Sequence, residues 1–368
     1  MQEHEAPKES KAGEKGVERP LFMPSPGFAE WLESSGGSLV LSTYQSGRVV
    51  FLGIDANGRF YGQERVIGTA MGLAYHDNRL WVGCRDQIWT FSRLSPRVFE
   101  GRAFDAVFKP HLGYLVGQCN THDVVADVTF RGEHHELLIA NTQYSCISAL
   151  DPVHSFRPVW TPGFVSALVP EDRCHLNGIC AEAGELAYAT ICGRFDERLA
   201  WKKAPTGQGF VVDVRTDNVV CEGLSMPHSP RMHDGRLWLL NSGEGELGFV
   251  DRSTRAFRSV APCAGFARGL AFVDGHAVVG LSRLRVNKEG LLPAINLADR
   301  LADRKVIQRC GLQVFELDSG RLVHWLNIEG VVSELYDVLF LPGIPRPGSP
   351  GFSALQNAAL VDFPGQIT

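Results

Sequence analysis

The sequence lacks the features of several large protein classes. Its 368 residues contain no apolar run of the roughly twenty residues that a bilayer-spanning helix needs. The first ten residues are polar and charged, so we expect no secretory signal peptide. Positive charge is not in excess, because 36 Lys and Arg stand against 41 Asp and Glu, a net charge of −5. We therefore expect a cytoplasmic protein that binds neither membranes nor nucleic acids.

Cysteine motifs and the common catalytic motifs are also missing. The nine cysteines are an odd number, are scattered along the chain and form no Cys-x-x-Cys pair. This spacing argues against a disulfide framework, a zinc ribbon and an iron–sulfur cluster, and favours reduced thiols. The chain has no Gly-x-Ser-x-Gly elbow and no Walker loop, so neither a serine hydrolase nor a nucleotide-binding fold is supported.

Short strands separated by turns dominate most of the sequence. Helical periodicity is rare, whereas the 39 glycines and 20 prolines are typical of a chain rich in turns. Residues 1–20 are charged and poor in apolar side chains, which predicts a disordered tail. We expect one folded domain over residues 21–345. The Pro- and Gly-rich residues 346–368 would form a tail that packs on the domain or leaves it.

A repeated unit runs through the predicted domain. Each unit combines a short strand, a polar turn and a second strand, and several units add a third strand that ends in aspartate. The units begin at Met71, His122, His175, His228, Arg268 and Tyr336. Their starts lie about 53 residues apart on average, a period typical of β-propeller blades.

The two ends of this domain complement each other. The last unit supplies only an inner strand, residues 336–341, whereas residues 39–53 contain middle strands with no inner strand before them. Pairing the two would remove exposed sheet edges. We therefore predict an all-β fold, a six-bladed β-propeller closed by N-terminal strands and a C-terminal inner strand. A pair of β-sandwiches or a seven-bladed ring is the alternative, although we assign the charged residues 283–305 to a loop.

Histidine is the first residue of three consecutive units. His122, His175 and His228 would line the central channel, where three neutral imidazoles bind Zn, Fe, Cu or Mn and leave one coordination position open. We predict a divalent transition metal there. The alternative is a metal-free ring of histidines that binds a ligand or only braces the blades.

Neighbouring residues could assist this cofactor site. Asp123, Asn177 and Asp337 lie beside the unit starts and would orient the imidazole nitrogens.

Three further residues are candidates for catalysis. Arg231 and Arg268 would hold a carboxylate or phosphate of the substrate, and Tyr336 would transfer or orient a proton. Glu334 precedes the last inner strand and could reach the mouth of the channel.

Four segments are distinctive: SMPHSPR at 225–231, LSTYQSGR at 41–48, RGLAF at 268–272 and ELYDV at 334–338. With these segments the chain resembles, over residues 30–345, an uncharacterised bacterial family of conserved hypothetical proteins. The resemblance implies no activity.

At the level of fold, the histidine positions resemble two groups of propeller enzymes. One is the amidating lyase that cleaves peptidyl-α-hydroxyglycine, in which three histidines hold zinc and Arg and Tyr assist. The matching positions here are His122, His175, His228, Arg268 and Tyr336, with Arg231 as an alternative. The other is the gluconolactonase group, which uses Glu, Asn and Asp as ligands. The chain departs from the second group by presenting histidines, and from the lyase by lacking a signal peptide.

Two functional hypotheses follow. The first is a mononuclear metal enzyme of the lyase, hydrolase or oxygenase class that acts on a small or peptidic anionic substrate. The second is a non-enzymatic propeller that binds a protein or peptide partner on one face.

Overall fold

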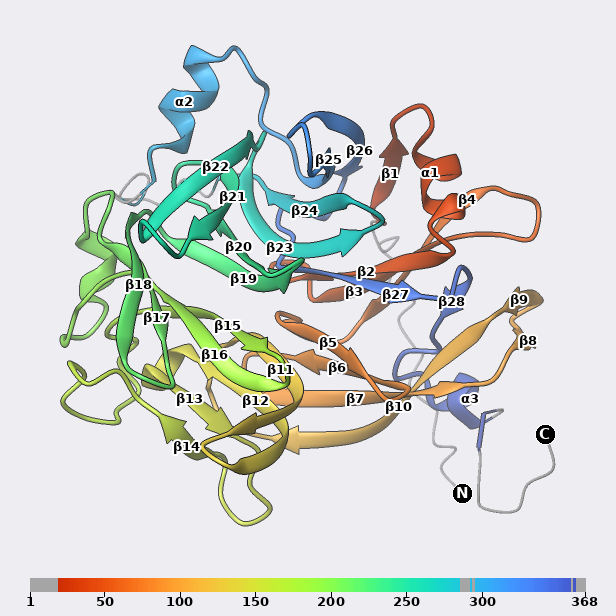
Figure 1. Cartoon of the computed structure of the whole chain (residues 1–368). Helices are drawn as coiled ribbons and strands as arrows, with labels where there is room; N and C mark the ends of the chain where they lie inside the picture. Colours follow the sequence, from red (N-terminus) through yellow and green to blue (C-terminus); the bar gives the residue numbers. More distant parts are fainter. Residues whose placement is uncertain (1–18, 285–291, 293–294, 359, 362–368) are drawn as a thin grey trace, which may run out of the picture.

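The protein is built almost entirely of β-strands (Figure 1). The computed structural model describes residues 19–284, 292, 295–358 and 360–361. The strands form mainly antiparallel sheets that are grouped around a common centre. The all-β class predicted from the sequence is confirmed, and the arrangement is propeller-like.

The first sheets along the chain each start from a strand near the centre. One joins the two ends of the fold, with β27 (Asp337–Pro342), β2 (Gly37–Thr43), β3 (Arg48–Ile54) and β4 (Phe60–Val66). The next contains β5 (Leu73–His76), β6 (Arg79–Gly83), β7 (Gln87–Leu94), β10 (Ala106–Leu115) and β28 (Pro347–Gly348). A third unit contains β11 (Thr121–Phe130), β12 (Glu133–Asn141), β13 (Cys146–Ala149) and β14 (Arg157–Trp160).

Three further units complete the set. The fourth contains β15 (Leu176–Glu182), β16 (Glu185–Ile191), β17 (Gly209–Asp213) and β18 (Asn218–Leu224), and one parallel contact links β16 to β11. The fifth contains β19 (Pro227–His233), β20 (Arg236–Asn241), β21 (Glu246–Asp251) and β22 (Ala256–Pro262). The last contains β23 (Phe266–Val273), β24 (His276–Ser282), β25 (Gly311–Glu316), β26 (Leu322–Glu329) and β1 (Leu21–Pro24).

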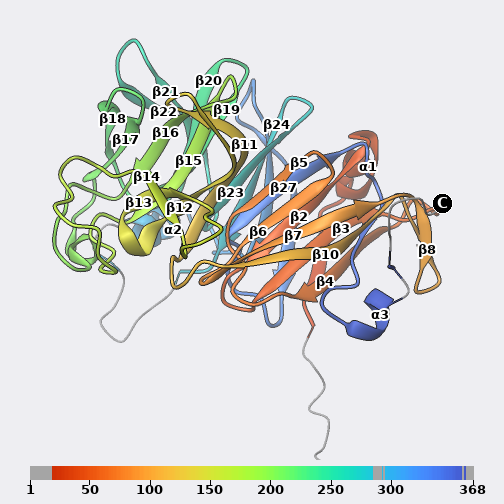
Figure 2. The ribbon, with the colours of Figure 1, turned by 90° about the horizontal axis from the view of Figure 1, so that it is seen from below.

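The remaining elements are short. They are the hairpin of β8 (Arg97–Phe99) and β9 (Arg102–Phe104), the helices α1 (Phe28–Ser34), α2 (Leu297–Asp303) and α3 (Ala354–Ala358), and the 3-10 turns Thr142–Tyr144 and Ala200–Lys203. Helix α1 packs on β2, β3 and β26, whereas α3 lies outside the sheets (Figure 2). No helix in the described ranges is both long and apolar enough to cross a membrane.

The innermost strands surround the centre of the molecule. In the order β5, β11, β15, β19, β23 and β27, each of these strands contacts the next, and β27 contacts β5 in turn. Strand β27 pairs with β2 along its whole length, from Ser42 opposite Asp337 to Gly37 opposite Pro342. The first and last parts of the folded chain therefore share one sheet.

Five tight turns explain why the inner two strands of most units form hairpins. In each turn both central residues have positive φ, the backbone of a type I′ turn, which matches the twist of paired strands. The pairs are Asp77–Asn78, Arg131–Gly132, Ala183–Gly184, Asp234–Gly235 and Asp274–Gly275. Asp, Asn and Gly tolerate this conformation best, so the polar turn of the sequence repeat has a direct structural role.

Middle strands are buried on both faces because they lie between neighbouring sheets. In β3 every residue is buried. Val50 and Leu52 pack into the core on one side of the sheet, whereas Val49 and Phe51 pack into the core on the other. Side chains alternate across a strand, so a continuous apolar run fills two interfaces between sheets.

The structure can be compared with the sequence-based predictions for three segments: the N-terminal tail, residues 283–305 and the C-terminal end. The tail predicted over residues 1–20 lies, apart from residues 19 and 20, outside the described residues. Residues 283–305 contain α2 rather than only a loop, although parts of this segment also lie outside the described residues. At the C-terminal end, β28 pairs with β10, and Phe352 contacts Trp89 with ring centres 4.5 Å apart.

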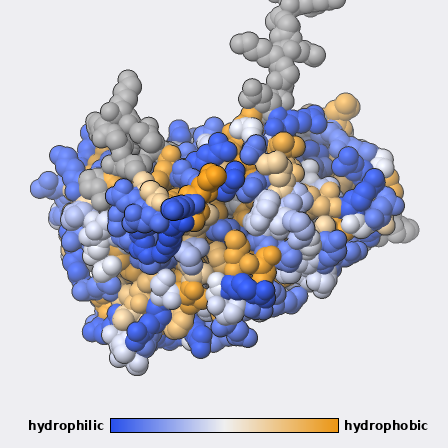
Figure 3. Space-filling view, turned by 90° about the horizontal axis from the view of Figure 1, so that it is seen from above, coloured by the Kyte–Doolittle hydropathy of each residue, from blue (hydrophilic) through white to orange (hydrophobic). Residues whose placement is uncertain are grey.

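On the face shown in Figure 3, hydrophobic residues form small patches among hydrophilic ones.

Candidate functional site

A cavity of about 340 Å³ opens where the inner strands begin. Five of the six unit starts line it: Met71, His122, His175, Arg268 and Tyr336. Glu334 also lines it. The sixth unit start, His228, lies behind the wall. Its ring contacts Phe266, a lining residue, with ring centres 5.5 Å apart. The repeat register therefore brings the candidate residues of distant units to one place.

The rings of His122 and His228 are oriented in the same way. In each case Nδ1 lies 2.8 Å from the backbone carbonyl oxygen two residues earlier, at Asn120 and at Met226. Both of these earlier residues have a left-handed backbone, with φ of 50° and 49°. A carbonyl oxygen only accepts, so Nδ1 carries a proton in both rings, and in the neutral form of each ring the lone pair is on Nε2. His228 Nδ1 also lies 3.1 Å from the hydroxyl of Ser242.

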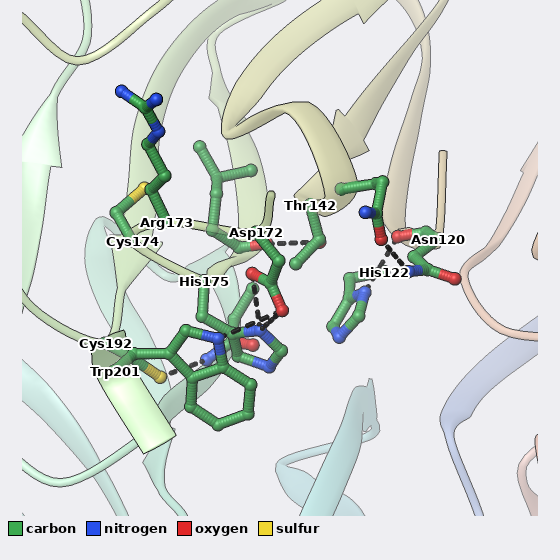
Figure 4. A network of polar contacts seen from close by, with 12 residues as sticks. Asn120, His122, Thr142, Asp172, Arg173, Cys174, His175, Cys192 and Trp201 are labelled. Carbon is green, nitrogen blue, oxygen red and sulfur yellow. Dashed lines mark hydrogen bonds and ion pairs between the residues drawn. The ribbon is translucent and has the colours of Figure 1, made fainter. Parts of the chain in front are cut away.

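His175 is held by a carboxylate and an indole (Figure 4). Its Nδ1 lies 2.9 Å from Oδ2 of Asp172, which also accepts a 3.0 Å hydrogen bond from Nε1 of Trp201. The Trp201 ring stacks on the imidazole at 3.6 Å. A carboxylate on one ring nitrogen fixes the ring and raises the basicity of the other nitrogen. Sequence reasoning missed Asp172 and Trp201, because both lie in long loops outside the repeat register.

The rings of His122 and His175 approach each other across the cavity. Their centres are 4.9 Å apart and their planes make an angle of 84°. Two imidazoles that bind one zinc ion at about 2.0–2.1 Å, at a roughly tetrahedral angle, have centres about 5 Å apart. The pair therefore has the spacing of two ligands of one ion. Within the described residues, however, no group of three or more His, Cys, Asp and Glu side chains is placed to hold a metal ion.

His228 is buried. Burial, and next the positive charge of Arg268, hold its pKa well below the usual range for histidine. Its Nε2 is buried and has no hydrogen-bond partner among the residues that the structure describes. Neutral imidazole with a bare Nε2 is the form that binds metals or accepts a hydrogen bond.

The guanidinium of Arg268 lies against two aromatic rings at the cavity. Its guanidinium carbon lies 5.0 Å from the ring centre of Phe266 and 4.9 Å from that of Tyr336. Arg268 forms no hydrogen bond or ion pair with the described part of the chain, and its Nε is buried. The aromatic faces hold the guanidinium in position without using its N–H donors in regular hydrogen bonds.

Arg231, the other arginine candidate, lies elsewhere in the centre of the molecule. Its guanidinium donates to both oxygens of Asp123, at 2.8 and 3.1 Å, and pairs with Asp337 at 3.5 Å. These two carboxylates also accept backbone N–H groups of adjacent sheets, from Ile179 and Leu73. The three side chains thus join inner strands, and none of them lines the cavity.

The side chains expected to orient the histidines have other partners. Asp123 and Asp337 bind Arg231, while Asn177 donates to the carbonyl oxygen of Pro227 at 3.0 Å. Successive residues of a strand point to opposite sides, so the residue that follows His122 turns away from the cavity. The imidazoles are oriented instead by Asp172 and by backbone carbonyls.

Left-handed backbone recurs among the residues that line the cavity. Five lining residues have a left-handed backbone with φ between 48° and 54°: Asn120, Asp172, His175, Leu199 and Met226. The conformation is easy for Asn and Asp but costs free energy for bulkier side chains. Clusters of such residues are found at binding and catalytic sites. Four of these five residues are not histidines, so the backbone conformation is a second reason to regard the cavity as the candidate site.

Strand order and the central site place the protein in the β-propeller class. The chain belongs to the family described as Domain of unknown function (DUF4915), whose model matches residues 26–349. No curated protein is similar enough in sequence to count as a match.

Several solved structures are similar over most of the chain. A chain of the nidogen/laminin complex is 10% identical, with 83% of this chain and 99% of that chain covered and a TM-score of 0.49. Apo AztD from Citrobacter koseri is 10% identical, with 83% and 98% covered and a TM-score of 0.35. Dihydro-heme d1 dehydrogenase NirN in complex with DHE is 12% identical, with 83% and 75% covered and a TM-score of 0.36. At these identities the activities of those proteins do not transfer to this chain.

Proposed function

We propose that residues 21–345 form a single six-bladed β-propeller, closed by the pairing of β2 with β27. The proposal is supported by the six innermost strands, each of which contacts the next around the centre. It is further supported by the sheet that the first and last strands share. Such an arrangement leaves no inner edge open and fixes the starts of the inner strands around one cavity.

We further propose that this cavity is a metal-dependent site, with His122, His175 and His228 as ligands of one divalent transition ion. The observation that carries the proposal is that the three imidazole rings are held through the same nitrogen atom. Each Nδ1 is engaged by a protein oxygen, which leaves Nε2 as the coordinating atom. The spacing of His122 and His175 supports them as the first two ligands. His228 would be the third ligand, and its binding would require a change in its own side chain or in Phe266, whose ring it contacts.

The surrounding residues would serve an anionic substrate, small or peptidic. Arg268 would bind its carboxylate or phosphate, and Tyr336, whose ring centre lies 5.5 Å from that of His122, would donate or orient a proton. The ion would polarise a substrate oxygen or activate water. These roles fit a lyase, a hydrolase or, with a redox metal, an oxygenase.

Metal analysis tests the site. Protein purified without a His-tag would be analysed by plasma mass spectrometry, then stripped with a chelator and titrated calorimetrically with Zn²⁺, Mn²⁺ and Fe²⁺. We expect one equivalent in the wild type and its loss in the variant His122→Ala/His175→Ala/His228→Ala. The control is His111→Ala/His154→Ala, in which two exposed histidines are removed and binding is expected to persist.

Two results would contradict the proposal. One is a wild-type protein that holds no metal after purification or reconstitution. The other is an equal loss of metal in the control variant, which would assign the binding to surface histidines. Either result would favour a propeller that binds a peptide or protein without catalysis.

A further inference from the structure

The cavity has a polar wall and an apolar wall. His122 and His175 belong to the polar wall, and the Trp201 ring of the apolar wall stacks on His175. The apolar wall consists of Trp201, Met226, Phe266, Leu284, Leu292 and Ile295. Behind it, Leu297 and Leu301 of α2 are buried in the same hydrophobic cluster. A ligand that fills the cavity therefore meets a hydrophobic surface on one side.

Positive charge lies beside the apolar wall. Arg268, Lys202 and Arg283 line the cavity together with the carboxylates of Asp172 and Glu334, and Arg268 forms no ion pair with either of them. The carboxylate of Asp172 is already shared by His175 and Trp201. A partly buried guanidinium without a partner is unfavourable, and a carboxylate with its two oxygens is the best match to its geometry.

We propose that the cavity binds a hydrophobic monocarboxylic acid, with its carboxylate on Arg268 and its apolar body against Trp201, Met226 and Phe266. At roughly 30 Å³ for each water-sized group, a volume of about 340 Å³ holds about eleven non-hydrogen atoms. Octanoate and 3-phenylpropanoate have this size. The inference rests on the proposed function for the location of the site, but it does not require the metal.

Calorimetric titration of the chelator-treated protein tests this ligand class. The probes are acetate, butanoate, hexanoate and octanoate, with octanamide as the uncharged match of octanoate. We expect affinity to rise about three- to fourfold per methylene group up to octanoate, because each one leaves water for the apolar wall. We expect octanoate to bind at least tenfold more tightly than octanamide.

Variants assign the charge to one residue. Arg268→Gln should reduce the preference for octanoate over octanamide at least tenfold, whereas Arg59→Gln, at an exposed position outside the cavity, should change it less than threefold. Arg268→Lys keeps the charge and should retain part of the preference, which keeps the test informative if Arg268→Gln does not fold.

Three outcomes would overturn the inference: equal affinity for octanoate and octanamide, no gain with chain length, or an unchanged preference in Arg268→Gln. The proposed metal site is tested separately. Failure of metal binding with normal octanoate binding would overturn the metal site alone. Normal metal binding without octanoate binding would overturn this inference alone.

Discussion

Replacing Arg231 by methionine tests whether the central ion cluster holds the sheets together. The side chain donates twice to Asp123 and once to Asp337, so it joins strands β11, β19 and β27. The two carboxylates are almost completely buried, with 4% and 5% of their side chains exposed. Methionine has a similar length but no charge, so the substitution leaves two buried carboxylates without a cation.

The expected cost follows from this burial. Removal of one partner of a buried ion pair costs about 3–5 kcal/mol, because the remaining charge stays desolvated. Asp123 keeps the backbone N–H donors of Val124 and Ile179, and Asp337 keeps those of Leu73 and Val338. These remaining hydrogen bonds argue for the lower half of this range. At about 2 °C per kcal/mol for a chain of this size, we expect the melting temperature to fall by about 6–8 °C at pH 8.

The assay is thermal unfolding at pH 8 and pH 5, followed by circular dichroism. The loss should be smaller at pH 5, because burial raises the pKa of Asp337 to about 7; this carboxyl is then protonated in the wild type as well, and the substitution removes mainly the pairing with Asp123. Arg252→Met is the matched control. This arginine pairs with Glu182 at 2.8 Å but is 42% exposed, so its loss should cost less than about 1 kcal/mol. A shift in Arg231→Met no larger than in the control would refute the reasoning.

Three further predictions concern single residues. Burial, opposed by Arg231, raises the pKa of Asp337 to about 7, so the stability that the protonated carboxyl contributes is lost as pH rises from about 4 through 7. Asp337→Asn should therefore flatten the plot of unfolding free energy against pH over this range. The free energies would be measured by urea titration, and an unchanged dependence on pH would contradict the prediction. Gly269→Ala should cost at least about 3 kcal/mol, because φ is +78° and a Cβ would lie 2.5 Å from a backbone nitrogen of β27. Gly275→Ala, with φ of +74° and open space, should cost only about 1 kcal/mol, and equal midpoints of denaturation would count against the steric argument. Asp172→Ala should weaken Zn²⁺ binding about 10- to 100-fold by releasing His175, and unchanged calorimetric affinity would show that the carboxylate does not position the ring.

Local sequence signals were sufficient for the strand-rich class and for the position of the cavity. Turn pairs such as Asp234–Gly235 and Asp274–Gly275 predict hairpins because few residues tolerate two positive φ angles in succession. The units bounded by these turns put equivalent residues at equivalent places, so a common register could be read from the repeated pattern of strand, polar turn and strand. His122, His175 and Arg268 lie on one cavity for this reason.

The roles of individual polar side chains were less predictable. Arg231 and Arg268 are both arginines on inner strands, yet Arg231 pairs with two carboxylates, whereas Arg268 lines the cavity and forms no ion pair with a described residue. Their sequence neighbourhoods do not reveal this difference, because the partners Asp123 and Asp337 are more than one hundred residues away from Arg231.

The sequence by itself determined the strands, their turns and the shared register of the unit starts, because these depend on residues that are neighbours in the chain. The tertiary structure alone decided what orients each imidazole. Asp172 and Trp201 reach His175 from two long loops, and long loops carry no periodic signal that fixes their conformation. Their positions are set by packing against other sheets, a property of the assembled fold rather than of any segment within it.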